Sequence, residues 1–418
     1  MLKKYARSTP LLASPPSVAG LTRSGMYCAI VFAANKQQPA RRKARGAVLK
    51  TAKSYRRLKQ TAFKSSPMTP IAKALLALPA SFAKLSLVAP SSSSPQFINL
   101  CDGPSSPRQA RSTAQELAEG LASEAASVAP KFFYNALGSR LFEAITGLDE
   151  YYPTRTEAGI FAASQTKIAE TLAETGLAHP CLIDLGAGNC AKALNLIPHL
   201  RPRQYVPVDI SVDFLKEAAG QVQNSFPALD IVGVGMDFSA GLALPDEVQD
   251  HDRVFFYPGS SLGNFQPEQA LDFLQHMADP RQGKARGLLL GIDLVKDTAT
   301  LEAAYDDALG VTAAFNKNLL RNVNDLLASD FEVRQWRHVA LFNAEQSRIE
   351  MHLQAMCDLT VRWPGHARRF RAGERIHTES SYKYTLESMT ALLQQAGFRQ
   401  IRHWSDPDQW FAVFWAAV

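Results

Sequence analysis

The sequence predicts an α/β fold: a doubly wound, Rossmann-like sheet of mostly parallel strands, with a second, smaller α+β domain. Apolar runs of strand length recur along the chain, and each ends in glycine-rich or acidic residues; these runs are 181–186, 205–209, 229–238, 253–265 and 286–297. Helical patterns separate them, which is typical of parallel strands joined by helical crossovers. A stretch of mixed helical and strand-like patterns, 295–385, then interrupts this order, and it predicts the second domain.

The first run leads into a tight turn, Gly186-Ala187-Gly188, then a helix carrying Lys192 and a second strand ending at Asp209. Glycines let the backbone approach a ligand, and the amides at the helix start face it. An acid about twenty residues later can accept bonds from ribose hydroxyls. The stretch predicts an adenosine-bearing cofactor, but its GxGxxA pattern fits NAD as well as S-adenosylmethionine (SAM).

The next two strands favour SAM. One ends in Asp237-Phe238, an acid with an aromatic neighbour, and the following one ends in a second glycine-rich turn, 259–264. An acid after each of two neighbouring strands suits a single adenosine held at its ribose and at its adenine amino group. No second nucleotide half is indicated, so SAM is the better prediction.

The later elements follow in order. A helix is predicted at 267–279 and mixed helical structure at 301–328, followed by strands at 332–342 and 348–356. A further helix starts behind Thr385 and stops at Gly397, because a polar cap and a C-terminal glycine delimit helices. The closing runs, 398–406 and 409–418, predict a hairpin on the mostly parallel sheet.

These elements predict three parts of the chain. The cofactor-binding sheet would comprise 159–294 and 386–418, and a substrate-binding domain would comprise 107–158 and 295–385. Ligands of doubly wound sheets bind at the carboxyl ends of the strands, so we expect the second domain to cover that edge. Residues 1–106 are predicted to be a disordered tail.

Charge divides the chain at Asp102. The first 101 residues contain 17 of the 45 lysines and arginines and no acid, so the remainder has 28 basic and 39 acidic residues, a net charge of −11. An acidic body argues against nucleic acid as the main partner. The basic, Ser- and Pro-rich tail fits a targeting peptide, a solvated arm, or translation upstream of a true start such as Met68.

Composition excludes other classes. No run reaches the 18 or so apolar residues of a membrane span. The cysteines lack a CxxC or His-paired spacing, which argues against zinc and against a disulfide framework; they are Cys28, Cys101, Cys181, Cys190 and Cys357. We therefore expect a cytoplasmic protein, without metal or membrane association, that acts as a monomer.

The chain resembles the SAM-dependent L-histidine Nα-methyltransferases of ergothioneine biosynthesis over 107–418. The motifs that carry the resemblance include PKFFYNALGSRLFEAIT, LDEYYPTRTE, DLGAGNCAK, PGSSLGNF, DLVKDTATLEAAYDDALGVTAAFNKN, RIEMHL and IHTESSYKY. The resemblance implies that the substrate is held by Tyr151, Asn264, Tyr305, Glu379, Ser380 and Ser381. It implies SAM contacts at Gly186, Lys192, Asp209, Asp237 and Phe238.

By this resemblance, Asn264 and Tyr305 hold the amino-acid end of histidine, while Glu379 and Ser381 bond the imidazole. Methyl transfer from a sulfonium to an amine needs positioning rather than a covalent nucleophile. No catalytic residue is assigned, and Tyr134 is the one candidate; its ring and that of Tyr151 could face the growing ammonium. Three transfers would give hercynine.

Other interpretations remain open at this point. The substrate could be another amino acid or amine, or the protein could bind SAM or another ligand without catalysis. Tyr151 could be part of a packed turn, Tyr305 an aromatic at the core edge, and Asn264 a helix cap. Glu379 lies in an alternating stretch typical of a solvated strand. We expect Met351 to line the pocket, and His352 and His377 to be structural.

Overall fold

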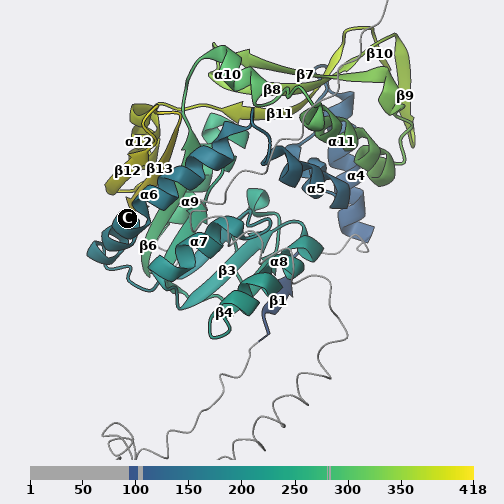
Figure 1. Cartoon of the computed structure of the whole chain (residues 1–418). Coiled ribbons are helices and arrows are strands. Elements are labelled where there is room, and N and C mark those ends of the chain that lie inside the picture. Colours follow the sequence, from purple (N-terminus) through teal and green to yellow (C-terminus); the bar gives the residue numbers. More distant parts are fainter. Residues whose placement is uncertain (1–93, 102–106, 280, 282–283) are drawn as a thin grey trace, which may run out of the picture. The chain divides into compact units, whose positions relative to one another are not determined.

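The computed structural model describes residues 94–101, 107–279, 281 and 284–418 (Figure 1). The predictions for 1–93 and 102–106, including Met68, lie outside the described residues. The expectation of one continuous disordered tail is not met at Gln96–Asn99, which form strand β1 and pair in parallel with β4. The sequence signal was weak because QFIN is short and follows a low-complexity stretch.

An eight-stranded mixed sheet forms the centre of the fold, in the order β1-β4-β3-β2-β5-β6-β13-β12. Only the contacts of β13 with β6 and β12 are antiparallel, so the predicted late hairpin on a mostly parallel sheet is confirmed. The strands after β1 are β2 (Cys181–Leu185), β3 (Gln204–Asp209), β4 (Asp230–Gly235), β5 (His251–Tyr257), β6 (Lys284–Asp293), β12 (Gln400–Ser405) and β13 (Phe411–Ala417).

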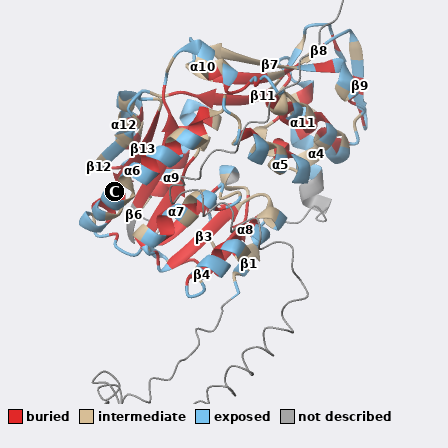
Figure 2. Cartoon of the chain, in the orientation of Figure 1, coloured by how far each residue is buried: buried red, intermediate tan, exposed pale blue. Residues whose placement is uncertain are grey.

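Helices cover both faces of this sheet, which explains why its inner strands are apolar without alternation. Leu182 packs with one set of helices and its neighbour Ile183 with the other. Figure 2 shows the strands buried and the outer sides of the helices exposed. On one face lie α6 (Tyr152–Glu174), α7 (Ala191–Leu200) and α8 (Val212–Ser225), and on the other α9 (Pro267–Ala278) and α12 (Leu386–Gln395).

The predicted helix limits at α12 agree with the structure. The Thr385 hydroxyl accepts a hydrogen bond from the Ser388 amide, and Gly397 follows the helix with a φ of +107°. Only glycine adopts such a φ without strain, so this residue ends the helix. At 301–328 the predicted helical stretch is divided, because Gly310, with a φ of +74°, separates two helices.

A second hydrophobic core lies apart from the sheet. It is built on the antiparallel sheet β11-β8-β7 and the hairpin β10-β9. Its helices are α4 (Pro107–Ala122), α5 (Ala136–Ile145), α10 (Thr298–Ala303) and α11 (Val311–Leu327), and its strands are β7 (Trp336–Asn343), β8 (Arg348–Ala355), β9 (Leu359–Trp363), β10 (His366–Phe370) and β11 (Arg375–Tyr382). The predicted boundary at 158/159 falls inside α6, whose first residue, Tyr152, belongs to this second core.

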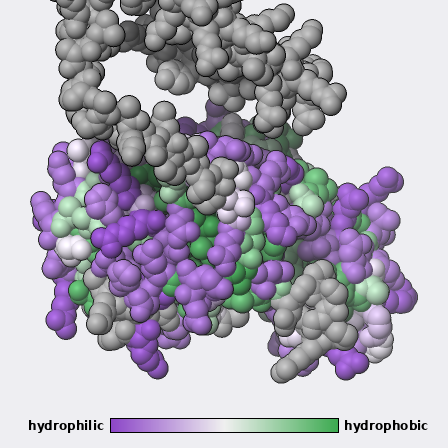
Figure 3. Space-filling view, turned by 90° about the horizontal axis from the view of Figure 1, so that it is seen from below, coloured by the Kyte–Doolittle hydropathy of each residue, from purple (hydrophilic) through white to green (hydrophobic). Residues whose placement is uncertain are grey.

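The surface is mostly hydrophilic (Figure 3), as expected when most of the apolar residues are buried in these cores. In the view of Figure 3, hydrophilic residues make up most of the coloured surface, with hydrophobic ones in patches among them. Within the part of the chain that the structure describes, no helix combines the length and apolar composition needed to cross a membrane.

One glycine in β6 leaves room for a tryptophan ring of the neighbouring strand, so Gly287→Ala is expected to destabilise the protein. A Cβ at Gly287 would lie 2.0 Å from Cη2 of Trp415, a fully buried ring on the neighbouring strand. We expect a loss of about 1–3 kcal/mol from overpacking, measured by urea unfolding. The matched control is Gly159→Ala in α6, where nothing lies within 4 Å of the added Cβ. That change should be neutral or stabilising, and equal effects at both positions would contradict this account.

Candidate functional site

The carboxyl ends of five parallel strands carry Asp293 and five of the predicted site residues, among them all the predicted cofactor residues except Lys192. Gly186 follows β2, Asp209 ends β3, Asp237 follows β4, Asn264 lies in a short 3₁₀ helix after β5, and Asp293 ends β6. Because these strands are adjacent and parallel, their ends meet along one edge of the sheet, where doubly wound folds bind ligands.

The glycine turn after β2 is held against Asp209. Gly186 and Gly188 have φ angles of +69° and +52°, a region that favours glycine. The Asp209 carboxylate accepts hydrogen bonds from the amide of Gly188 at 2.9 Å and from that of Ser211 at 2.8 Å. Burial raises the pKa of Asp209, and these amides oppose the rise. The carboxylate is therefore fixed at the turn.

Asp237 and Phe238 lie beside the same turn. The Phe238 ring is 3.9 Å from where a Cβ of Gly186 would be, so the space above this glycine is bounded by an aromatic ring. The Asp237 carboxylate pairs with Lys131 at 3.3 Å and accepts a bond from the Ser239 amide. The structure thus brings Gly186, Asp209 and the Asp237-Phe238 pair to one place.

Lys192 lies between this cluster and the turn after β5. Its ammonium is 2.7 Å from the Glu157 carboxylate, whose other oxygen accepts the Gly259 amide at 2.8 Å. Glu157 is buried, and sequence analysis missed it. A signal was present, because Glu157 is three residues before the apolar Ile160 and so shares its side of the helix. Glu157 links the Lys192 side chain to the backbone of the neighbouring pocket.

A pocket opens beside Gly259, between the sheet edge and the second core. Its lining residues come from both regions: Tyr134, Phe142, Ile145, Tyr151, Gly259, Ser260, Ser261, Asn264, Ala304, Tyr305, Thr312, Phe315, Met351, Glu379 and Ser381. The structure therefore brings together the predicted substrate residues Tyr151, Asn264, Tyr305, Glu379 and Ser381, together with the candidate Tyr134.

Aromatic rings form one wall of this pocket. Tyr134 packs edge-on against Phe142 and Phe315, with centroids 5.8 and 5.9 Å apart, and Tyr151 packs edge-on against Tyr305 at 6.3 Å. Burial raises the pKa of Tyr134 and Tyr151 well above the usual value, so both remain neutral phenols. The faces of neutral aromatic rings attract a cation, so this wall suits a positively charged group.

Strand β11 supplies the polar wall. Glu379 and Ser381 are two residues apart, so their side chains lie on the same face of the strand. Burial raises the pKa of the Glu379 carboxyl to about 7, and the nearby Lys383 limits the rise. Gly263 allows the turn carrying Asn264 to approach β11, since a Cβ there would be 2.7 Å from the Tyr382 carbonyl oxygen.

Ser380 does not join the pocket, in contrast to the expectation for it. Strand alternation turns its side chain away from Glu379 and Ser381, and its hydroxyl lies 3.0 Å from Nε2 of His377. Met351 lines the pocket, as expected. His352 and His377 are outside the lining, and Nε2 of His352 lies 2.9 Å from the Glu350 carboxylate.

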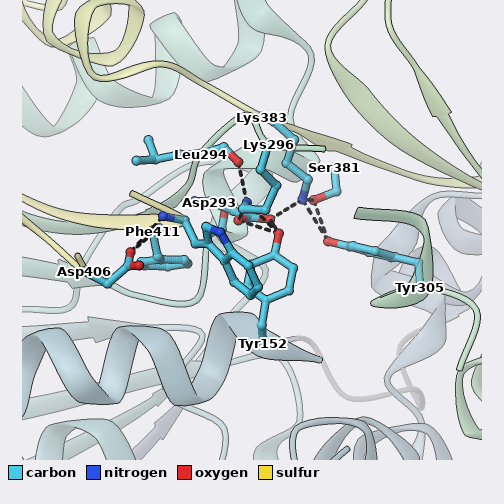
Figure 4. A network of polar contacts seen from close by, with 11 residues as sticks. Tyr152, Asp293, Leu294, Lys296, Tyr305, Ser381, Lys383, Asp406 and Phe411 are labelled. Atoms are coloured by element: carbon cyan, nitrogen blue, oxygen red, sulfur yellow. Dashed lines mark hydrogen bonds and ion pairs between the residues drawn. The ribbon is translucent and has the colours of Figure 1, made fainter. Parts of the chain in front are cut away.

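A buried charge network lies behind the polar wall (Figure 4). The Asp293 carboxylate pairs with Lys296 at 2.6 Å and with Lys383 at 2.8 Å, and it accepts the Tyr152 hydroxyl at 2.7–2.8 Å. Asp293 has no exposed surface. Sequence analysis missed this network, because its members come from α6, the end of β6 and the end of β11 and share no local pattern.

In the described ranges, no three His, Cys, Asp or Glu side chains are grouped as potential metal ligands. Cys101, Cys181, Cys190 and Cys357 are free thiols.

Comparison with known proteins agrees with this geometry. A family profile described as "Histidine-specific methyltransferase, SAM-dependent" matches residues 113–418. The chain is 40% identical to the histidine N-alpha-methyltransferase of Mycolicibacterium smegmatis over 70% of this chain and 91% of that one. It is 38% identical to the enzyme of that name from Mycobacterium tuberculosis, over 72% and 94%.

A fungal relative aligns over a smaller share of its length. Ergothioneine biosynthesis protein 1 of Neurospora crassa is 29% identical over 65% of this chain and 31% of that protein. The match of the profile to most of the chain, and the two bacterial relatives, decide the assignment. This chain belongs to the SAM-dependent histidine-specific methyltransferase family.

Proposed function

We propose that this enzyme transfers methyl groups from SAM to the α-amine of L-histidine, three times, to give hercynine for ergothioneine biosynthesis. The observation that carries the proposal is the pocket in which Glu379 and Ser381 face Asn264, Tyr151 and Tyr305. Its lining combines polar side chains with aromatic rings, which suits an amino acid with a small polar ring. The names of the bacterial relatives support the same reaction.

The residues around the glycine turn fit SAM. In our proposal the Asp209 carboxylate holds the ribose, Asp237 the adenine amino group, and Phe238 the adenine ring, with Gly186 and Lys192 on the methionine side. The fit rests on the buried carboxylate, the left-handed glycines and the ring bordering Gly186. When bound, SAM supplies a sulfonium methyl group that an amine nitrogen can attack.

The chain's own residues would position the amine and exclude water. Asn264, Tyr151 and Tyr305 would hold the amino-acid end, while Glu379 and Ser381 fix the imidazole. Each transfer forms a nitrogen–carbon bond as the sulfur–carbon bond breaks, and the product ammonium must lose a proton before the next transfer. Much of the rate then comes from orientation. The faces of Tyr134 and Tyr151 would stabilise the growing cation.

We further propose that the enzyme acts as a monomer in the cytoplasm, on a small molecule rather than on nucleic acid. The free thiols in the described ranges suit a reducing compartment. The net charge of −11 from Asp102 onward disfavours polyanions.

The proposal is tested by mass spectrometry of a reaction containing the protein, SAM and an equimolar mixture of the standard amino acids. We expect selective formation of trimethylated histidine, and its loss in Glu379→Ala. Methylation of another amine with histidine unmodified would overturn the substrate, and the absence of any transfer would favour a binding protein.

The assignment of Asp209 predicts a loss of cofactor affinity in Asp209→Ala. Removal of two charge-assisted bonds to the ribose should raise the dissociation constant of S-adenosylhomocysteine about ten- to hundredfold, measured by calorimetry. Asp213→Ala is the matched control, because that carboxylate lies fully exposed on α8. Equal affinity of both variants for the ligand would argue against the ribose role.

A further inference from the structure

Tyr305 lies outside the helices and strands that carry most of the pocket. It follows α10, which ends at Ala303, and α11 begins only at Val311. The segment 304–310 between these helices reaches the surface, where Leu309 is 79% exposed. A segment of this kind is held by individual contacts rather than by a ladder of backbone hydrogen bonds. The place of the Tyr305 ring in the pocket therefore depends on those contacts.

Both ends of Tyr305 are held, each by a different strand. Its hydroxyl lies 2.8 Å from Oγ of Ser381 on β11 and 3.2 Å from the ammonium of Lys383, which follows that strand (Figure 4). Its backbone carbonyl oxygen lies 2.8 Å from Nε2 of His338 on β7. The His338 side chain is 2% exposed. A buried imidazole thus holds the main chain of a pocket residue whose side chain is held by the polar wall.

The neighbours of His338 define its tautomer. A carbonyl oxygen can only accept a hydrogen bond, so Nε2 carries a proton and donates it to Tyr305. Across the ring, Nδ1 lies 2.8 Å from Nδ2 of Asn316, which is itself 3.1 Å from the carbonyl oxygen of His352.

The orientation of the Asn316 amide follows from the same contacts. If the amide were turned round, its oxygen would face the carbonyl oxygen of His352, and two acceptors would meet in a buried place. The nitrogen therefore stays there and donates one proton to His352 and the other to a bare Nδ1 of His338. Burial also lowers the pKa of His338, which agrees with a neutral ring.

We propose that His338 is a positioning residue for the methyl transfer: its neutral ring, with the proton on Nε2, fixes the backbone of Tyr305 and so places the Tyr305 hydroxyl against the amino-acid substrate. The inference rests on the proposed function and deepens it, because Tyr305 holds the amino-acid end of histidine there. His338 is not among the residues that line the pocket, so it acts through Tyr305.

Two amide substitutions test this assignment, because each reproduces one nitrogen of the imidazole. In His338→Gln the amide nitrogen can reach the place of Nε2 and donate to Tyr305, whereas in His338→Asn it ends near the place of Nδ1. His338→Leu removes both nitrogens. In steady-state kinetics with saturating SAM, we expect the asparagine and leucine variants to lose about tenfold in kcat/KM for histidine and the glutamine variant less than about threefold.

His352→Leu is the matched control. It removes an imidazole from the neighbouring strand β8, and that side chain pairs with Glu350 outside the pocket. Its kcat/KM should stay within about twofold of the wild type, and all four variants should keep the affinity for S-adenosylhomocysteine within about twofold. A loss in His352→Leu as large as that in His338→Leu would overturn the specific role of His338.

A second substitution separates positioning from general loosening of the fold. If His338 acts through the Tyr305 hydroxyl, His338→Leu should cost less than about twofold in kcat/KM once Tyr305→Phe has removed that hydroxyl. The same loss in both backgrounds would mean a purely structural role and would overturn the inference.

Failure of this inference can be told apart from failure of the proposed function. If the wild type does not methylate histidine, the proposed function fails and the inference with it. If histidine is methylated but His338→Leu keeps the full kcat/KM, or His338→Gln is as impaired as His338→Asn, only the inference fails. Should His338→Leu not fold, the comparison of the glutamine and asparagine variants still decides.

Discussion

Replacing Asp293 with asparagine is expected to lower the free energy of unfolding by about 3–5 kcal/mol, because it leaves two buried ammonium groups without their carboxylate. Asp293 has no exposed surface, and the side chains of Lys296 and Lys383 are 5% and 0% exposed. Asparagine has nearly the same volume, so no cavity contributes. The measurement is urea unfolding at neutral pH, followed by circular dichroism.

The control is another aspartate paired with a lysine, at the surface. Asp213 lies 3.7 Å from Lys216, with its side chain fully exposed, and such pairs contribute about 0–1 kcal/mol. Asp213→Asn should therefore leave the unfolding curve nearly unchanged. Comparable losses in the two variants would mean that the buried network does not hold the sheet end and β11 together.

Glu379→Gln is expected to reduce kcat/KM for histidine about ten- to hundredfold. The glutamine keeps the shape of the side chain and one acceptor oxygen, but the charge that strengthens the hydrogen bond to the ring N–H is lost, which costs about 1.5–3 kcal/mol. Affinity for S-adenosylhomocysteine should change little, because Glu379 lies on the β11 wall and not beside the glycine turn.

Glu379→Gln should also stabilise the ligand-free enzyme against unfolding near pH 8. Burial raises the Glu379 pKa from its ordinary 4.5 to about 7, so between these values the folded state binds a proton that the unfolded state has lost. The stabilisation that protonated Glu379 contributes is complete below about pH 4.5 and is lost as the pH rises through 7. Near pH 8 the glutamine variant should be more stable by up to about 3 kcal/mol.

Steady-state kinetics and unfolding at about pH 5 and about pH 8 test this pair of effects. Glu345→Gln is the control, since that carboxylate is exposed in the turn before β8. It should affect neither activity nor stability. A Glu379→Gln enzyme that retained full activity, or was no more stable near pH 8 than near pH 5 relative to wild type, would contradict the role given to burial.

Patterns along the chain predicted the central strands of the sheet well, because strands buried on both faces are apolar at nearly every position. The run at 181–185 and the closing hairpin are examples, and α12 had clear signals at both ends. The hairpin of β9 and β10 was not predicted. Arg362, Arg368 and Arg369 give it a polar sequence, and its inward residues, such as Trp363, are few.

The site was only partly predictable from sequence. The resemblance named the residues that the pocket brings together, but it also included Ser380, which strand alternation turns away. The burial of Asp293 and Lys383 was not foreseeable, because nothing in the sequence around them distinguishes them from exposed charged residues. Their burial is stable only because partners distant in the sequence reach them, and such pairing leaves no periodic signal.

The position of β13 inside the sheet has a consequence for how the protein is made. This strand pairs with β6 on one side and β12 on the other, yet among the eight strands of the described sheet it leaves the ribosome last. Until residues 411–417 emerge, the edge of β6 that pairs with β13 in the folded protein is exposed. Residues 298–382, which lie between these two strands in the sequence, are then joined to the sheet at one end only. Pairing at such sequence separation is slow, and exposed strand edges invite aggregation. Nascent chains halted shortly before Phe411 would therefore be the species most dependent on chaperones.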